Sequence, residues 1–114
     1  MRNILITGAT GNVGMEVIKS LSKLNHEFEI YAGAFNVEKD KLKLKDYTLN
    51  IVHFDFTDVA TYKPALAHCD ILFLLRPPQL SEVNKYFKPI IALVVSSGVK
   101  HIVFYQYKAL KKVK

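Results

Sequence analysis

The stretch ITGATGNVG, residues 6–14, closes an apolar run and then places Gly8, Gly11 and Gly14 three residues apart. The segment that follows repeats its apolar residues at intervals of three and four, which is typical of an amphipathic helix. A strand that turns into a helix through such glycines is the setting of the dinucleotide-binding fingerprint. We therefore predict a nucleotide-binding loop here, and the alternative is a tight glycine-rich turn that binds no ligand.

Each glycine has an expected role in such a loop. Gly8 permits a tight turn, Gly11 lets a pyrophosphate approach the main chain without meeting a Cβ, and Gly14 allows the helix to lie close to the strand. These roles follow from the absence of a side chain, so any larger residue is expected to interfere with them.

The residues between the glycines are expected to supply hydrogen-bond donors. Thr10 and Asn12 carry side-chain donors, and the N–H groups of Asn12 and Val13 begin a helix without intrahelical acceptors. The positive end of the helix dipole favours an anion at the same place. Together they predict a pyrophosphate site.

The hydrophobic pattern along the chain predicts an α/β fold. Strand-like apolar runs cover residues 3–7, 28–34, 49–54, 71–75 and 101–105. Each of the first four is followed by a helix-compatible segment, so we expect a Rossmann-type parallel sheet of about five strands, in the order 3-2-1-4-5, with helices on both faces. The runs 71–75 and 101–105 are nearly continuous in apolar residues, which predicts strands buried on both faces.

A helix is expected over residues 82–97. Pro89 lies within this segment, so the helix either kinks there or a second helix begins there. Gly98 follows the last apolar residues and is expected to end the helix in the left-handed conformation.

Length and composition set the outer bounds of the interpretation. We expect the 114 residues to form one domain, and the apolar runs are too short to span a membrane. The net charge of +6 raises the possibility of a nucleic-acid partner, but the lysines lack interleaved aromatic residues, which favours a solvated surface. Cys69 is the only cysteine, so no internal disulfide is possible and we expect a cytoplasmic location. Because Cys69 adjoins the apolar run 71–75, we expect it to be a small core residue.

Five segments together resemble a known family. TGATGNVG, FNVEK, HFDFTD, CDILFLL and SSGVKHIVF occur in an order that is similar to the N-terminal half of NmrA-like proteins, an atypical branch of the short-chain dehydrogenase/reductase superfamily. The resemblance covers about residues 3–106 and implies an NAD(P)-binding Rossmann domain. That family contains NADPH-dependent reductases and also redox-sensing regulators without clear catalysis.

The resemblance implies further cofactor contacts. Asp55 and Phe56 match an acidic and an apolar position near the adenine, although Asp55 is open to the alternative of a cap or turn former. Leu75, Arg76 and Pro77 match positions near the ribose and nicotinamide, with simple solvation as the alternative for Arg76.

Two positions bear on the choice of cofactor. NADP-binding members commonly carry an arginine where this chain has Phe35, so the expected partner of a 2′-phosphate is missing. No acidic residue stands at the end of the second strand to hold the ribose hydroxyls of NAD. Lys39 keeps the second basic position of the family, and Phe35 is able to stack on adenine. NADP is weakly favoured over NAD.

No complete catalytic or metal site is expected. Gln106 replaces a serine common in the family, and the Tyr107 to Lys111 spacing falls in a basic tail, residues 107–114, where it is best explained by chance. The chain is expected to be truncated relative to the family. It is either an NAD(P)-binding module without turnover by itself, or the cofactor-binding half of an oxidoreductase whose substrate domain is missing or on another chain. Whether it is an enzyme is left open.

A partner is expected at the fifth strand. The run 101–105 places apolar residues on both faces, and the tail 107–114 has few apolar residues with which to cover them. We therefore predict a homo-oligomer, or a second chain, at this strand.

Overall fold

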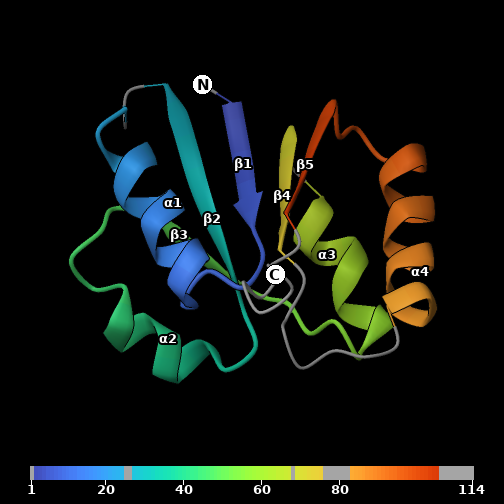
Figure 1. Cartoon of the computed structure of the whole chain (residues 1–114), viewed down its shortest axis with the longest axis horizontal. Coiled ribbons are helices and arrows are strands. Elements are labelled where there is room, and N and C mark those ends of the chain that lie inside the picture. The colour runs from blue at the N-terminus through green and yellow to red at the C-terminus, as the bar shows by residue number, and fades with distance from the viewer. Residues whose placement is uncertain (1, 25–26, 68, 76–82, 106–114) are drawn as a thin grey trace, which may run out of the picture.

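The computed structural model describes residues 2–24, 27–67, 69–75 and 83–105. Five parallel strands form one sheet in the order β3-β2-β1-β4-β5 (Figure 1). This confirms the predicted fold class and strand order. The strands are β1 (Arg2–Ile6), β2 (Phe28–Ala34), β3 (Asn50–His53), β4 (Ile71–Leu75) and β5 (His101–Tyr105).

Helices cover both faces of the sheet, as predicted. They are α1 (Asn12–Ser22), α2 (Val37–Lys43), α3 (Tyr62–Leu66), which follows the short 3-10 turn η1 (Val59–Thr61), and α4 (Val83–Ser96). In Figure 1, α1 and α2 lie to one side of the central strands, and α3 and α4 lie to the other.

The two faces are divided by the alternation of side chains along β1. Ile4 and Ile6 pack in one buried cluster with Ile18 of α1. Leu5, which lies between them in the sequence, packs in the other cluster with Tyr62 and Ile90. Successive strand residues point to opposite faces, so a single strand supports both helical layers.

The end of α4 differs from the prediction. One helix runs through Pro89, so no second helix begins there. Gly98 does not take the left-handed conformation, since Gly8 is the only described glycine with positive φ. Serine side chains bond to the backbone here instead: the Ser97 hydroxyl donates to the Val94 carbonyl at 3.0 Å and accepts from the Val99 N–H at 3.3 Å.

The strands β4 and β5 differ in burial although their sequences look alike. On β4, Leu72 and Leu74 of one face are fully buried, and on the other face Leu75 is buried while Ile71 and Phe73 are half-buried, so the predicted burial of both faces is only partly met. On β5, Ile102 is 41% and Val103 is 45% exposed, so the prediction of burial on both faces is wrong for this strand. The reason is position: among the described strands, β5 pairs only with β4 and forms the edge of the sheet.

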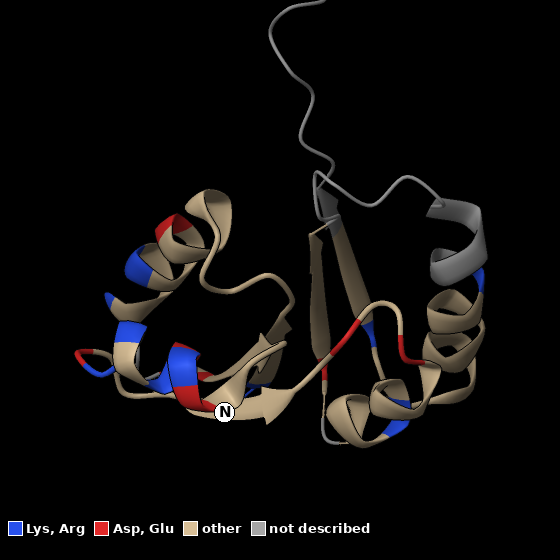
Figure 2. Cartoon of the chain, turned by 90° about the horizontal axis from the view of Figure 1, so that it is seen from below, with Lys and Arg blue, Asp and Glu red and all other residues tan. Residues whose placement is uncertain are grey.

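Acidic and basic side chains are mixed on the surface. Acidic and basic residues lie side by side on α1 and α2 (Figure 2). Examples are the pairs Glu16–Lys19 at 3.6 Å on α1 and Glu38–Lys41 at 3.9 Å on α2. Of the helices in the described ranges, none is long and apolar enough to cross a membrane.

Candidate functional site

The glycine loop between β1 and α1 makes the predicted tight turn. Gly8 has φ +62°, in the left-handed region that other residues rarely adopt. The N–H of Gly11 donates to the Gly8 carbonyl at 3.1 Å, which closes the turn. Gly8 therefore acts as a turn residue, as expected.

Gly14 and Gly11 differ in what surrounds them. A Cβ on Gly14 would collide with the Gly8 carbonyl oxygen and lie 2.7 Å from that of Ala9. The close approach that Gly14 permits is thus to the loop itself rather than to the strand. Among the described residues, a Cβ on Gly11 would have only the Gly8 oxygen nearby, at 3.4 Å, which is an ordinary contact. The described part of the chain therefore has room for a side chain at Gly11.

The first turn of α1 is open to an anion. No side chain caps this helix, and Met15 is the first residue whose N–H is bonded at its start, to the Gly11 carbonyl at 2.9 Å. Within the described part of the chain, the N–H groups of Asn12, Val13 and Gly14 have no acceptor. Such groups at the positive end of a helix dipole form a binding site for phosphate.

The strands β1 and β4 meet where the strand order reverses. In open α/β sheets, ligands bind in the crevice at the carboxyl ends of the strands at this point. Thr7 follows β1, is fully buried, and accepts a hydrogen bond on Oγ1 from the Leu75 N–H at 2.8 Å. A Cβ on Gly8 would lie 3.6 Å from the Leu75 Cβ, so Leu75 lies against the loop. Arg76 and Pro77, predicted to follow it in the site, are outside the described residues.

A cleft of about 540 Å³ opens beyond the ends of β1, β2 and β3. Five predicted site residues line it: Gly8, Thr10, Phe35, Asp55 and Phe56. Its other lining residues were not predicted: Ala9, Gly33, Asp40, Phe54 and Thr57. The remaining described candidates do not line it: Gly11, Asn12, Val13, Gly14, Lys39 and Leu75.

Aromatic rings form one wall of this cleft. Phe54 packs edge-on to Phe56 with ring centres 4.9 Å apart, and stacks on Tyr62 at 5.4 Å. Gly33 allows this packing, since its Cβ would lie 3.2 Å from the Phe54 Cβ. Phe35 contributes a ring that is 70% exposed. A glycine inside an apolar strand run is the sequence signal that points to such a close approach.

The carboxylate of Asp55 is partly engaged in a turn. Its Oδ1 accepts from the Thr57 N–H at 2.9 Å and from the Thr57 hydroxyl at 2.7 Å. The alternative of a turn former therefore holds for this oxygen. Asp55 nevertheless borders the cleft, so both roles are compatible with its position.

Asp40 is the site residue that sequence reasoning missed most clearly. It lies on α2, is only 8% exposed and borders the cleft. The Thr10 hydroxyl donates to Asp40 Oδ1 at 3.3 Å. A hydroxyl has one proton, so in this arrangement Thr10 is not a free donor toward a pyrophosphate, contrary to the expectation.

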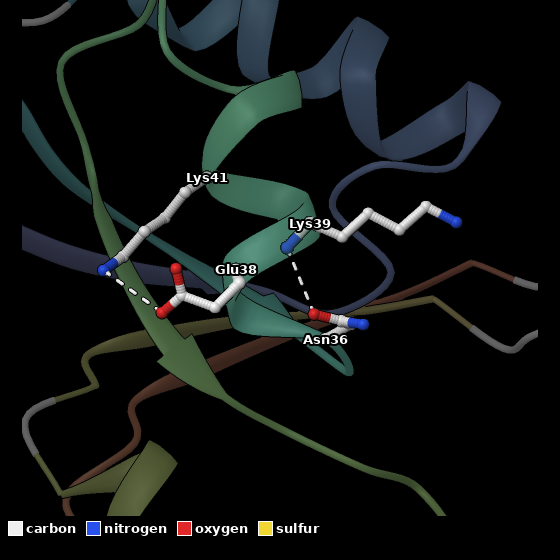
Figure 3. Close-up of polar contacts among 4 residues, drawn as sticks. All are labelled: Asn36, Glu38, Lys39 and Lys41. Atoms are coloured by element: carbon white, nitrogen blue, oxygen red, sulfur yellow. Dashed lines mark hydrogen bonds and ion pairs between the residues drawn. The ribbon is translucent and has the colours of Figure 1, made fainter.

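Lys39 precedes Asp40 on α2 but does not line the cleft. Asn36 caps this helix by accepting the Lys39 N–H at 3.1 Å, and Glu38 pairs with Lys41 (Figure 3). The Lys39 side chain extends away from that pair (Figure 3). No carboxylate in the described ranges pairs with its ammonium group.

Cys69 is a core residue, as predicted. It is 6% exposed, and its thiol donates to the Ile71 carbonyl at 3.0 Å. Burial raises the pKa of the Cys69 thiol to about 11, so the thiol is neutral at pH 7. Over the part of the chain that the structure describes, no group of three His, Cys, Asp or Glu is placed to hold a metal ion.

The family model of the NmrA-like family matches residues 1–114. The chain belongs to the NmrA-like family. It is 32% identical to the Prestalk A differentiation protein A of Dictyostelium discoideum over 103 residues, which are 89% of this chain and 34% of that protein.

Solved structures of reductases share the fold. A Citrobacter sp. triphenylmethane reductase complexed with NADP(H) superposes with a TM-score of 0.74 at 26% identity, over 96% of this chain and 39% of that one. An NADPH-dependent quinone oxidoreductase from Escherichia coli has a TM-score of 0.71 at 30% identity, over 89% of this chain and 34% of that one. The chain therefore spans between a third and two fifths of the length of these proteins.

Proposed function

We propose that this chain is a single NAD(P)-binding domain that holds the cofactor pyrophosphate at the glycine loop 8–14. The observation that supports the proposal is that an open space and the first helix N–H groups lie together at that loop. Gly11 leaves a space that the described residues do not fill, next to three helix N–H groups without a described acceptor. The loop also lies at the reversal of strand order, where α/β sheets bind their ligands.

The adenosine part of the cofactor fits the cleft beside the loop. Phe35 and Phe56 offer apolar surface to the adenine ring, and the Asp55 carboxylate offers an acceptor to its amino group. Leu75, Arg76 and Pro77 are proposed for the ribose and nicotinamide side. NADP is weakly preferred over NAD, because two reductases of similar structure are named for NADP(H) and the Lys39 ammonium is available for a phosphate.

The bound nicotinamide would supply hydride-transfer chemistry, and this chain would bind and orient the cofactor. We propose binding without turnover by the chain alone. The second candidate is the cofactor-binding half of an oxidoreductase, which the reductases with 34% and 39% coverage favour. Gln106, Tyr107 and Lys111 lie outside the described residues.

Calorimetric titration with NADPH and NADH, followed by an assay of NADPH oxidation with a quinone, tests these proposals. Binding without oxidation supports the binding module, and oxidation supports the enzyme half. Absence of binding of either cofactor would overturn both.

We also propose that a second copy of the chain covers the edge strand β5. Ile102 and Val103 follow each other on the strand, so they expose apolar surface on both faces of the sheet. Two such edges related by a two-fold axis would pair with each other and bury this surface. The tail residues 107–114 lie outside the described residues. A cytoplasmic location remains our expectation from the single, buried cysteine.

A further inference from the structure

Asp40 is a buried carboxylate on the wall of the proposed adenosine cleft. Its Oδ1 accepts the Thr10 hydroxyl, and its Oδ2 accepts no hydrogen bond from the described residues. Because Asp40 lines the cleft, a ligand bound there would lie beside this carboxylate. A free carboxylate oxygen there is a ready acceptor for a ligand hydroxyl.

The position of Asp40 is defined by three neighbours in the cleft. The lining includes the turn residues Gly8 and Thr10 after β1 and Phe35 after β2. In Rossmann domains the adenosine ribose lies between these two strand ends, and an acidic side chain near the second strand binds its 2′-hydroxyl. Asp40 comes from α2, six residues after β2 ends at Ala34, so it reaches this place from the helix rather than from the strand.

The charged residues of the cleft lining are acidic. Among the described residues, the charged side chains that line the cleft are Asp40 and Asp55, and neither lysine nor arginine is found with them. Lys39 is exposed and stands outside the lining. A phosphate on the ribose 2′-oxygen would therefore approach a carboxylate that Thr10 hydrogen-bonds, and no described cation of the cleft lining would offset the repulsion.

We infer that Asp40 is a specificity-determining residue that opposes the 2′-phosphate of NADP and accepts a hydrogen bond from the 2′-hydroxyl of NAD. This inference rests on the proposed cofactor site. It agrees with the weak preference for NADP proposed above: Lys39 would favour the phosphate from outside the cleft, and Asp40 would disfavour it from inside.

The test compares Asp40→Asn with Glu38→Gln by calorimetric titration of the full chain with NADPH and NADH. Asp40→Asn removes the charge but keeps an acceptor for Thr10, so NADPH should bind roughly tenfold more tightly, while NADH affinity should change less than about threefold. Glu38→Gln removes one charge from the same helix outside the cleft, and should leave the ratio of the two affinities within about twofold of wild type. An unchanged ratio in Asp40→Asn, or an equal change in Glu38→Gln, would overturn the inference.

A second experiment uses only the wild-type chain, so it does not depend on whether a variant folds. Adenosine 2′,5′-bisphosphate and adenosine 5′-monophosphate differ only in the 2′-phosphate, and both are titrated into the wild-type chain. If Asp40 opposes the phosphate, the bisphosphate should bind no more than about tenfold more tightly; a gain above about 100-fold would refute the inference. Failure of the wild type to bind any of these nucleotides would instead overturn the proposed function, and the inference with it.

Discussion

The side chain of Thr7 joins the end of β1 to the end of β4 through both backbone groups of Leu75. Its Oγ1 accepts the Leu75 N–H at 2.8 Å and lies 3.3 Å from the Leu75 carbonyl oxygen, within reach to donate to it. Thr7 is fully buried and Leu75 is 7% exposed, so no water substitutes for this hydroxyl. The two strands on either side of the reversal of strand order are thereby held together beneath the proposed site.

Thr7→Val should destabilise the domain. Valine has the same shape but leaves the buried Leu75 N–H without a partner, which costs about 1–3 kcal/mol of unfolding free energy. Thr7→Ser keeps the hydroxyl and serves as the control. Urea unfolding measures both, and equal stability of the valine variant and the wild type would show that this bond contributes nothing.

Gly11→Val should weaken cofactor binding without unfolding the domain. The backbone of Gly11, with φ −75° and ψ 176°, suits valine, and an added Cβ meets only ordinary contact. The side chain would fill the space proposed for the pyrophosphate, so NADPH affinity should fall by at least about 2 kcal/mol, measured by calorimetry. Undiminished NADPH binding would place the site elsewhere.

Gly14→Ala should destabilise the folded domain. Its Cβ would overlap the carbonyl oxygens of Gly8 and Ala9, which cannot move without breaking the turn. We expect a loss of about 1–3 kcal/mol in unfolding free energy. Thermal and urea unfolding check this, and a fully stable variant would mean that the loop relaxes freely.

Phe35→Arg should raise the preference for NADPH over NADH. The ring it replaces is 70% exposed and borders the cleft, so a guanidinium has room to reach a 2′-phosphate. The expected gain is about 1.5–3 kcal/mol for hydrogen bonds to a charged group. Phe35→Leu controls for the lost ring, and an affinity ratio equal to that of wild type would mean that residue 35 does not face the ribose.

Cys69 should react slowly with thiol reagents in the folded protein. Its pKa is raised from 9.0 to about 11, so at pH 8 its thiolate fraction is roughly 100-fold lower than in the unfolded chain. Because the folded state favours the neutral thiol, stability should fall as the pH rises from 9 toward 11. Alkylation rates with and without urea test the predicted difference in thiol reactivity, and equal rates would contradict the burial of the thiol. Urea unfolding at pH 9 and pH 11 tests the predicted loss of stability.

Val103→Lys should dissociate the proposed dimer. Val103 is 45% exposed on the edge strand β5, and two lysines brought together across a two-fold axis would repel each other. Leu42→Lys, at a position 73% exposed on α2, is the control that should leave association unchanged. Sedimentation over a concentration series measures this, and a wild-type chain that is monomeric throughout would exclude the dimer.

The elements of the fold were predictable because each is encoded locally. The bounds of β2 and β4 match the runs 28–34 and 71–75 in the sequence, and the glycine loop follows from the Gly8, Gly11 and Gly14 spacing. The exposure of β5 was not predictable from its own residues. It depends on which strands neighbour it, and that is a property of the whole sheet.

The candidate site was predictable only in part. The glycine loop and Phe35 carry signals of spacing or position, and they do meet at one end of the sheet. Asp40 looks like any acidic residue in a helix, and its hydrogen-bond donor is Thr10, thirty residues earlier. The role of Thr7 likewise depends on Leu75, 68 residues away. Such partnerships arise from tertiary packing, which sequence periodicity does not report.

The lining of the cleft runs from Gly8 to Thr57 and ends before β4 begins. The surface proposed to select the adenosine end of a cofactor is thus encoded by one uninterrupted stretch of the first half of the chain. Recombination that exchanged this stretch between family members would transfer cofactor choice as a unit. Cofactor preference and substrate range would then be free to diverge separately, since no described residue of the cleft lining lies downstream of Thr57.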